Sequence, residues 1–259
     1  MSKAVSVTPD GIRLAVSRQW APEAPVALEY NGISYAVMMA TPRDLEDFAS
    51  GFAITEGLAA SAAEVTGIAV AEVELGWILR ASLDGPGAAA IVERARTRVS
   101  ESGCGLCGIE NLEALAKPLP KVVAHEPLAQ GAIFAALAAL SGRQTLNDAC
   151  GAAHGAAWAD GDGAIHCLRE DVGRHNALDK LVGAMGRAGR PLTGGFVLST
   201  ARCSYEIVEK AVRAGATSLV TVSLPTTMAV ERARAAGLGL WCLARQDAVL
   251  LVNDPGSSP

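Results

Sequence analysis

The alternation of apolar and polar positions over residues 1–40 predicts β-structure. Residues 26–30 and 33–38 carry alternating apolar side chains on either side of Asn31-Gly32. An Asn-Gly pair between two such runs indicates a hairpin, because both residues accept the left-handed backbone of a two-residue turn. Upstream the alternation is rougher and predicts irregular β-structure, with apolar positions at Val5, Ile12, Leu14 and Val16.

Helical spacing replaces this alternation next. Phe48 and Phe52 share one face of a helix predicted from about residue 44 to residue 58. Gly51 and Gly57 lie within it, and we interpret them as a point of close packing and a C-cap.

Two further strands are predicted at residues 68–75 and 91–99. In the second strand Arg94, Arg96 and Arg98 alternate, so all three point to one face. Such a face is either solvated or a surface for an anionic ligand, since guanidinium groups bind phosphate well.

The second half has a regular rhythm of helices and strands. The predicted elements are a helix at 128–141, strands at 153–159 and 164–168, a helix at 175–186, a strand at 196–200, a helix at 205–214, a strand at 219–223, a helix at 227–236 and a strand at 238–243. This order predicts an α/β sheet with helices on both faces. The Pro-Leu-Pro stretch at 118–120 is the candidate boundary between an N-terminal domain, 1–120, and a C-terminal domain, 121–259.

Polar loops follow three of these strands, at residues 199–202, 223–226 and 244–247. Ligands of such sheets gather beyond the carboxyl ends of the strands. Two of the loops contain an arginine, Arg202 and Arg245, so this edge is a candidate site for an anionic ligand.

Composition narrows the class of protein. Half of the 259 residues are hydrophobic but only 4% are aromatic, which is typical of closely packed α/β layers built from small side chains. The net charge of -5 argues against nucleic acid as a general partner. No apolar run has the length of a membrane span, and the N-terminus lacks the apolar core of a signal peptide. We therefore expect a cytoplasmic protein whose six cysteines are reduced.

Residues 102–108 (SGCGLCG) hold two thiols, Cys104 and Cys107, among three glycines. The glycines predict a mobile loop at about 100–110, and helical spacing follows it. A helix start favours thiolate and makes sulfur nucleophilic. By itself, Cys-x-x-Cys is compatible with half of a zinc site, a redox pair, a sulfur carrier or inert residues.

The densest polar stretch is residues 169–180, between a predicted strand and a predicted helix. Asp171 or Asn176 could cap that helix, and Asp179 and Lys180 could be ordinary surface positions. Capping does not explain why four polar positions crowd the turn. They are Glu170, Arg174, His175 and Asn176. We therefore predict a functional site here.

Residues 170–180 (EDVGRHNALDK) resemble the signature of the FdhD family of formate dehydrogenase accessory sulfurtransferases. Four other stretches resemble further motifs of that family in the same order. They are residues 51–57, 102–108, 204–210 and 222–226. The resemblance covers roughly residues 25–248.

This resemblance implies a sulfur carrier. Members take persulfide sulfur from a cysteine desulfurase and pass it to the bis(molybdopterin guanine dinucleotide) molybdenum cofactor, before that cofactor enters formate dehydrogenase. Cys104 would carry the persulfide and Cys107 would relay or resolve it. The resemblance also implies a homodimer, and a cytidine deaminase-like C-terminal domain with a mixed sheet and flanking helices behind a smaller α+β N-terminal domain.

The cofactor would be a bound client, held by groups of the second domain, and no permanently bound metal is expected. The predicted cofactor-binding residues are Arg174, His175, Asn176, Arg202, Ser223, Thr226, Leu243, Ala244, Arg245, Gln246, Asp247 and Ala248. Guanine dinucleotide arms carry diphosphates, which favour bidentate arginine.

Two segments depart from the family pattern. Cys150 and Ala152 stand where the family usually has Thr and Gly ahead of a histidine, here His154. Leu243 and Gln246 stand where it tends to have Phe and Gly around an arginine. The changes at Leu243 and Gln246 bear on the cofactor contacts of that segment.

Three other functions make different demands on the sequence. A zinc deaminase needs His-x-Glu upstream of Pro-Cys-x-x-Cys, and that order is absent. A thiol-disulfide oxidoreductase remains compatible with the local sequence. A non-catalytic chaperone of the molybdenum cofactor would use the same arginine-bearing loops without a reactive thiol. Cys203 and Cys242 are interpreted as packed residues at strand ends.

Overall fold

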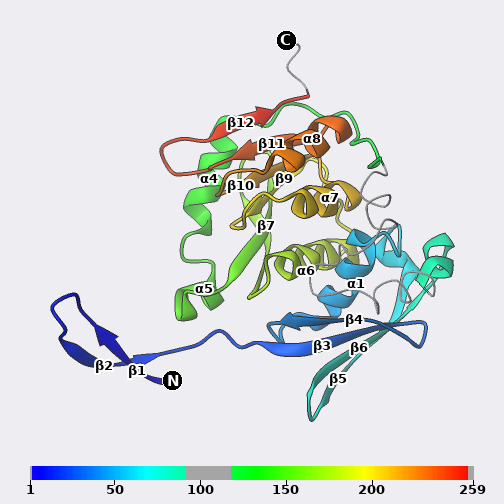
Figure 1. The fold of residues 1–259 in the computed structure, drawn as a ribbon. Helices are drawn as coiled ribbons and strands as arrows, with labels where there is room; N and C mark the ends of the chain where they lie inside the picture. The colour runs from blue at the N-terminus through cyan, green and yellow to red at the C-terminus, as the bar shows by residue number, and fades with distance from the viewer. Residues whose placement is uncertain (1, 92–117, 256–259) are drawn as a thin grey trace.

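The structure is a computed structural model in which residues 2–91 and 118–255 are described. It consists of a two-stranded arm, a four-stranded sheet and a six-stranded sheet with helices on both faces (Figure 1). Cys104, Cys107 and the three alternating arginines lie outside the described residues. The same holds for nearly all of the strand predicted at 91–99, but Ile91 itself has helical backbone angles at the end of a 3-10 helix, Pro86–Ala90.

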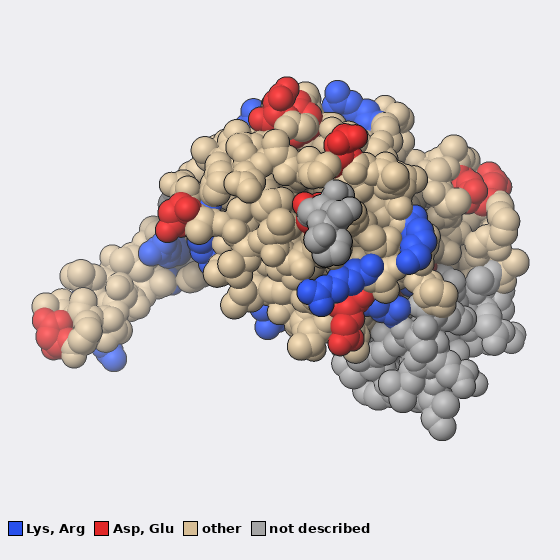
Figure 2. Space-filling model, turned by 90° about the horizontal axis from the view of Figure 1, so that it is seen from above, with Lys and Arg blue, Asp and Glu red and all other residues tan. Residues whose placement is uncertain are grey.

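The arm is an antiparallel hairpin of β1 (Ser2–Val7) and β2 (Arg13–Arg18). It stands out from the body in both views of the whole molecule (Figures 1 and 2). Its apolar side chains are largely exposed, as Val5, Val7 and Leu14 show. The irregular β-structure predicted here is therefore a regular hairpin, but one that buries little.

The predicted hairpin at 26–38 is confirmed. Strands β3 (Ala24–Tyr30) and β4 (Ile33–Ala40) pair antiparallel around Asn31 and Gly32, whose φ angles are 51° and 76°. Strands β5 (Val65–Val73) and β6 (Gly76–Leu83) complete a sheet of order β4-β3-β6-β5. Strand β6 was not predicted, because it follows β5 after only two residues and reads as a continuation of it.

Helix α1 (Leu45–Thr55) covers one face of this sheet, as its spacing predicted. Phe48 and Phe52 pack edge to face at 6.0 Å between ring centroids, and Phe52 stacks on Tyr30 at 6.5 Å. The helix is followed by Gly57 with a φ of 68°, in agreement with the predicted C-cap.

The second sheet is mixed, and its strand order is β12-β11-β10-β9-β7-β8. Strands β9, β10 and β11 run parallel. Strand β12 pairs antiparallel with β11, β7 pairs antiparallel with β9, and β8 pairs antiparallel with β7. The bounds are β7 His154–Asp160, β8 Ile165–Asp171, β9 Gly195–Ser199, β10 Ser218–Thr221, β11 Gly239–Cys242 and β12 Leu250–Asn253. The predicted strands are confirmed, and β12 is an addition.

Helices cover both faces of this sheet, as predicted (Figure 1). Helices α6 (Arg174–Arg187), α7 (Tyr205–Arg213) and α8 (Thr227–Ala236) pack on one face with residues such as Val197 and Leu219. Helix α4 (Gln130–Leu140) packs on the other face, against Phe196 and Leu198. A short helix, α5 (Thr145–Cys150), was not predicted.

Helices α1 and α6 meet backbone to backbone. A Cβ atom on Gly51 would lie 1.7 Å from the carbonyl oxygen of Asp179, and one on Gly183 would lie 1.8 Å from that of Asp47. The predicted role of Gly51 in close packing is therefore confirmed. One continuous apolar core joins α1 to the face of the large sheet that α6, α7 and α8 cover. The division proposed at 118–120 stays a prediction.

Among residues 2–91 and 118–255, no helix has the length and hydropathy needed to span a membrane.

Candidate functional site

The candidate site lies at the edge of the large sheet where its parallel strands end. Strand β7 runs antiparallel to β9, so β7 begins where β9 ends. His154, the first residue of β7, is paired with Asp171, the last residue of β8. Thr200, after β9, exchanges two hydrogen bonds with the backbone of Gly155, at 2.9 and 3.0 Å. The turn after β8 and the loop after β9 are therefore neighbours.

A buried ion pair fixes the turn between β8 and α6. Lys180 Nζ donates to Asp171 Oδ2 at 2.5 Å and to the carbonyl of Thr41 at 2.8 Å. Asp171 also accepts from the backbone N–H groups of Thr41 and Gly173, at 3.0 and 2.7 Å. Burial lowers the pKa of Lys180, and the charge of Asp171 opposes that shift. Asp171 thus joins the turn to the loop that precedes α1.

Two residues that could have been ordinary surface positions are fully buried. Asp179 and Lys180 are both 0% exposed, so that alternative is excluded. A charged helical residue is usually exposed, and burial is tolerated here because each has an oppositely charged partner and further hydrogen bonds.

Asn176 connects the turn to the end of β4 by hydrogen bonds. Its amide nitrogen donates to the carbonyl of Met39 at 2.9 Å and to Asp171 Oδ1 at 3.0 Å, and the residue is 2% exposed. A Cβ on Gly173 would lie 2.6 Å from this nitrogen, so the turn requires glycine at that position. Both donor hydrogens of Asn176 are used within the protein, which makes it a structural neighbour of the predicted ligand site.

Glu170 caps a helix, contrary to the prediction that capping does not explain it. Its carboxylate accepts from the backbone N–H groups of Leu146 and Asn147, at 2.8 and 2.9 Å, in the first turn of α5. The prediction was wrong because it considered only the helix that follows in sequence, and α5 was not foreseen.

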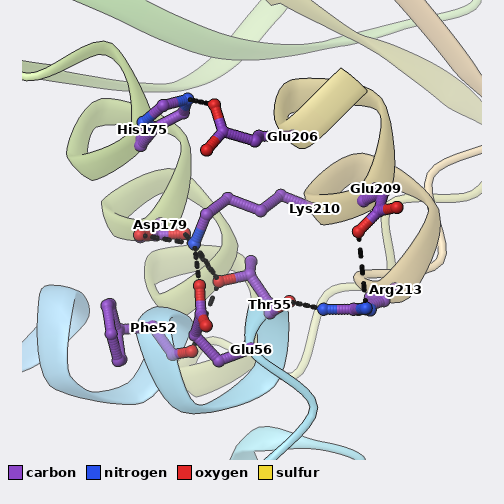
Figure 3. A network of polar contacts seen from close by, with 9 residues as sticks. All are labelled: Phe52, Thr55, Glu56, His175, Asp179, Glu206, Glu209, Lys210 and Arg213. Carbon is purple, nitrogen blue, oxygen red and sulfur yellow. Dashed lines mark hydrogen bonds and ion pairs between the residues drawn. The ribbon is translucent and has the colours of Figure 1, made fainter. Parts of the chain in front are cut away.

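Two contacts, one helical turn apart, connect α6 to α7 (Figure 3). Near the helix starts, His175 Nε2 lies 3.1 Å from Glu206 Oε2. Deeper in the core, Lys210 Nζ donates to both oxygens of Asp179, at 2.9 and 3.1 Å. The acidic residue is on α7 in the first contact and on α6 in the second, so a slip of one turn could bring the carboxylates of Glu206 and Asp179 together. The two contacts therefore fix the register of the two helices.

The deeper contact includes α1. Thr55 Oγ1 donates to Asp179 Oδ1 at 2.6 Å, and Lys210 also donates to Glu56 Oε1 at 2.9 Å (Figure 3). Burial by itself lowers the pKa of Lys210, but the charges of Asp179 and Glu56 outweigh it and the pKa is raised. Burial raises the pKa of Asp179 against the attraction of Lys210. Because both carboxylate oxygens accept from the ammonium group, we take the pair as ionised.

The outer contact is partly open to solvent. The side chains of His175, Arg174 and Glu206 are 23%, 31% and 40% exposed. Arg174 lies 3.9 Å from the same Glu206 oxygen that His175 contacts. The contact with His175 lowers the pKa of Glu206.

His154 belongs to the same positive environment. Burial lowers its pKa, and the charges of Arg174 and Arg202 add to the shift. Neither His154 nor Glu206 was among the predicted site residues. A signal existed for both: His154 closes a segment that departs from the family pattern, and Glu206 lies within the stretch 204–210 that resembles a family motif.

The loops after β10 and β11 are bonded together at the same edge. Leu243 N donates to Ser223 O at 3.1 Å, and the Arg245 guanidinium donates to the carbonyl of Val222. Arg245 N donates to Ala248 O at 2.8 Å and closes a turn.

The predicted residues of these loops have different surroundings. Thr226 caps α8 by accepting from Ala229 N at 3.3 Å. The side chain of Ala244 is buried in the core beneath α4. The exposed members are Arg202, Thr226, Arg245, Gln246, Asp247 and Ala248.

The described cysteines do not form a metal site. Cys203 and Cys242 are both free and buried, and their predicted packing is confirmed. A hydrogen bond between the two thiols, together with burial, raises the pKa of Cys203. Cys150 and Cys167 are free and partly exposed. Within the described part of the chain, no three His, Cys, Asp or Glu side chains are grouped so that they could hold a metal ion.

Comparison with known proteins gives the family. The model of the FdhD/NarQ family matches residues 21–257. A sulfur carrier protein FdhD from Bordetella petrii is 42% identical over 235 residues, which are 91% of this chain and 84% of that protein. A protein of the same name from Xanthomonas euvesicatoria is 43% identical with the same coverage.

A solved structure has the same fold. The crystal structure of a provisionally assigned formate dehydrogenase accessory protein from Desulfotalea psychrophila superposes with a TM-score of 0.78 at 24% identity. The superposition covers 98% of this chain and 96% of that one. The family match over most of the chain and the two relatives named above establish the assignment that the motif at 170–180 predicted: this chain belongs to the FdhD/NarQ family.

Proposed function

We propose that this protein is a sulfur carrier that serves the maturation of formate dehydrogenase. The observation that carries the proposal is its similarity, over 91% of the chain, to proteins named sulfur carrier protein FdhD. The proposed donor is a cysteine desulfurase, and the proposed acceptor is the bis(molybdopterin guanine dinucleotide) molybdenum cofactor. A homodimer that acts in the cytoplasm is part of the same proposal.

The proposed chemistry belongs to Cys104 and Cys107. The Cys104 thiolate attacks the terminal sulfur of the donor persulfide, a new sulfur–sulfur bond forms, and the donor thiolate leaves. Cys107 then relays the sulfur, or attacks Cys104 Sγ so that sulfur leaves as sulfide and a disulfide remains.

The proposed cofactor site is the edge of the large sheet. Arg174, His175, Arg202 and Arg245 supply positive charge and hydrogen-bond donors there, which suits the diphosphates of guanine dinucleotide arms. Ser223 and Thr226 add hydroxyl groups. The strand order and the helices on both faces support a cytidine deaminase-like second domain.

A persulfide assay tests the carrier role. The full chain is incubated with a cysteine desulfurase and cysteine, and its mass is measured after alkylation. The wild type should gain one sulfur atom on Cys104, and Cys104→Ala should gain none and should fail to support formate dehydrogenase activity in cells.

Cys150→Ala is the matched control, because Cys150 is a free, partly exposed thiol that lies outside the Cys-x-x-Cys motif, at the end of α5. It should behave as the wild type. Full formate dehydrogenase activity with Cys104→Ala would refute the carrier role and leave a non-catalytic cofactor chaperone. A Cys104–Cys107 disulfide that forms without added sulfur and without release of sulfide would indicate an oxidoreductase.

A further inference from the structure

The four-stranded sheet has an apolar outer face. Helix α1 covers its inner face, toward which the buried side chains of Val26, Leu28 and Leu79 point (Figure 1). On the opposite face, the strand registers place apolar residues in two neighbouring rows that cross all four strands. We call these two rows the outer patch: Val37, Ala27, Ile78 and Ala71 in the first, and Met39, Pro25, Gly76 and Val73 in the second.

The outer patch is exposed to solvent. Val37, Met39 and Val73 are 65%, 50% and 42% exposed. A sheet face that contacts water usually carries polar side chains, and a contiguous apolar surface usually marks a site of interaction. The outer patch therefore indicates a surface that a partner covers.

The N-terminal arm has an apolar face of its own. Val5 and Val7 point to the same side of the hairpin and are 59% and 60% exposed. Lys3 and Arg13 border this pair on the same side, because Lys3 is two residues before Val5 and Arg13 is paired with Val7. A hairpin of two strands is only marginally stable in water by itself, so the arm also requires a surface to pack against.

The charges of the two surfaces are complementary. Residues 2–18 contain three basic residues and one acidic residue. Two exposed acids lie beside the outer patch, Glu23 just before β3 and Glu74 in the turn after β5. Arg80 is the only basic residue on the four strands, and it is paired with Glu29 at 2.7 Å. A basic arm therefore meets an acidic border when its apolar face covers the outer patch.

We propose that the arm of one copy of this chain packs on the outer patch of a second copy, with Val5 and Val7 against the apolar rows, and that the two copies exchange arms reciprocally. This inference deepens the proposed homodimer, on which it rests for the number of copies, by assigning the surfaces that meet. It does not depend on sulfur transfer.

A second copy fits better than the sheet of the same chain. The arm stands out from the body and leaves the outer patch of its own chain exposed (Figures 1 and 2). Reciprocal exchange about a twofold axis covers both patches and both arms, so the assembly closes at two copies. The contact is also made twice, which doubles the apolar area that association buries.

Sedimentation of the full chain tests the assigned surfaces. Val37→Asp on the sheet and Val7→Asp on the arm should each weaken self-association about tenfold or more, because each puts a charge into an apolar contact. Two similarly exposed apolar residues give matched controls. Leu14→Asp, on the opposite side of the arm, and Val123→Asp, outside the sheet, should associate as the wild type does.

Two results of this measurement would overturn the arm contact. If Val37→Asp and Val7→Asp associate as tightly as the wild type, or if the controls lose as much affinity, the assigned surfaces are wrong and the homodimer stands. A wild type that remains monomeric overturns the arm contact and the homodimer together.

Photo-crosslinking identifies what covers the outer patch. Val37 is replaced by p-benzoylphenylalanine, and this protein is mixed with an excess of wild type labelled with heavy nitrogen before irradiation. The crosslinked peptide should come from the arm and should carry the label, because it belongs to the other copy. An arm peptide that stays unlabelled at every mixing ratio would show that the arm folds onto its own sheet. A peptide from any other segment, or none, would equally overturn the exchange.

The persulfide assay on the wild type separates this inference from the carrier role. A labelled arm crosslink without sulfur uptake would leave the arm contact standing and refute the carrier role. Sulfur uptake on Cys104 without an arm crosslink would overturn the arm contact alone.

Discussion

Lys180 and Asp171 hold the turn that carries the candidate site. The pair is completely buried, and Lys180 also bonds to the carbonyl of Thr41. Removing one member of a buried ion pair leaves the other charge without compensation, which costs more than the pair contributes. The turn therefore depends on a residue that contacts no ligand.

We expect Lys180→Met to lower the free energy of unfolding by about 3–5 kcal/mol. Methionine keeps most of the length and volume but leaves Asp171 buried and unpaired. Urea unfolding followed by circular dichroism measures the effect. Arg234→Met, at an exposed position of α8, should stay within about 0.5 kcal/mol of the wild type. Similar stabilities for the two variants would show that the pair does not hold the turn.

At the scale of single residues, the sequence placed the polar stretch correctly but not the roles of its members. Residues 170–180 do form a strand-to-helix turn, between β8 and α6, and a functional site there stays a prediction. The roles of Glu170, Asp179 and Lys180 depend on partners far along the chain, at Leu146, Thr55 and Thr41. No local pattern in one sequence reports such pairs.

At the scale of elements, α1 and α6 pack closely because each has a glycine where the two helices touch. Gly51 and Gly183 let each helix rest on the backbone of the other. Such an approach brings Asp179 within hydrogen-bond distance of Thr55, and Lys210 contacts both Asp179 and Glu56 (Figure 3). The glycines therefore make the buried polar network possible.

Gly51→Ala should destabilise the protein by roughly 3 kcal/mol or more, because its Cβ would lie 1.7 Å from a backbone oxygen that cannot move alone. The melting temperature measures it. Gly131→Ala, in α4, is the control, because a Cβ there has nothing within 4 Å. Alanine favours helix over glycine, so this variant should be equal to the wild type or up to about 1 kcal/mol more stable. A Gly51→Ala variant that melts like Gly131→Ala would contradict the close approach.

Elements with a long periodic pattern or a clear turn were predictable, and short ones were not. The hairpin at 26–38 has its Asn-Gly turn, and α6 has four turns of amphipathic spacing. Helix α5 has six residues and β12 has four, which is too few for a period to repeat. Strand β6 was missed for another reason, because a two-residue connection left no break after β5.

At the scale of the molecule, the two halves of the chain share one core and one buried polar network. Thr55 and Glu56 come from the first half, and Asp179 and Lys210 from the second. The predicted domains at 1–120 and 121–259 therefore meet through one network, in which Thr55 donates to Asp179 and Glu56 pairs with Lys210. Such an interface favours joint unfolding over separate unfolding.

We expect hydrogen exchange at increasing urea to show one transition. Amides of β3 and β6 should lose protection at the same urea concentration as amides of β9 and β10. Lys210→Met should lower the free energy of unfolding by roughly 3–5 kcal/mol, since it leaves Asp179 buried and uncompensated. The common transition should therefore move to a lower urea concentration. Adding Asp179→Asn to Lys210→Met should recover part of the loss, because the unpaired charge is then gone. If the four-stranded sheet loses protection first in the wild type, the halves unfold separately and the network does not couple them.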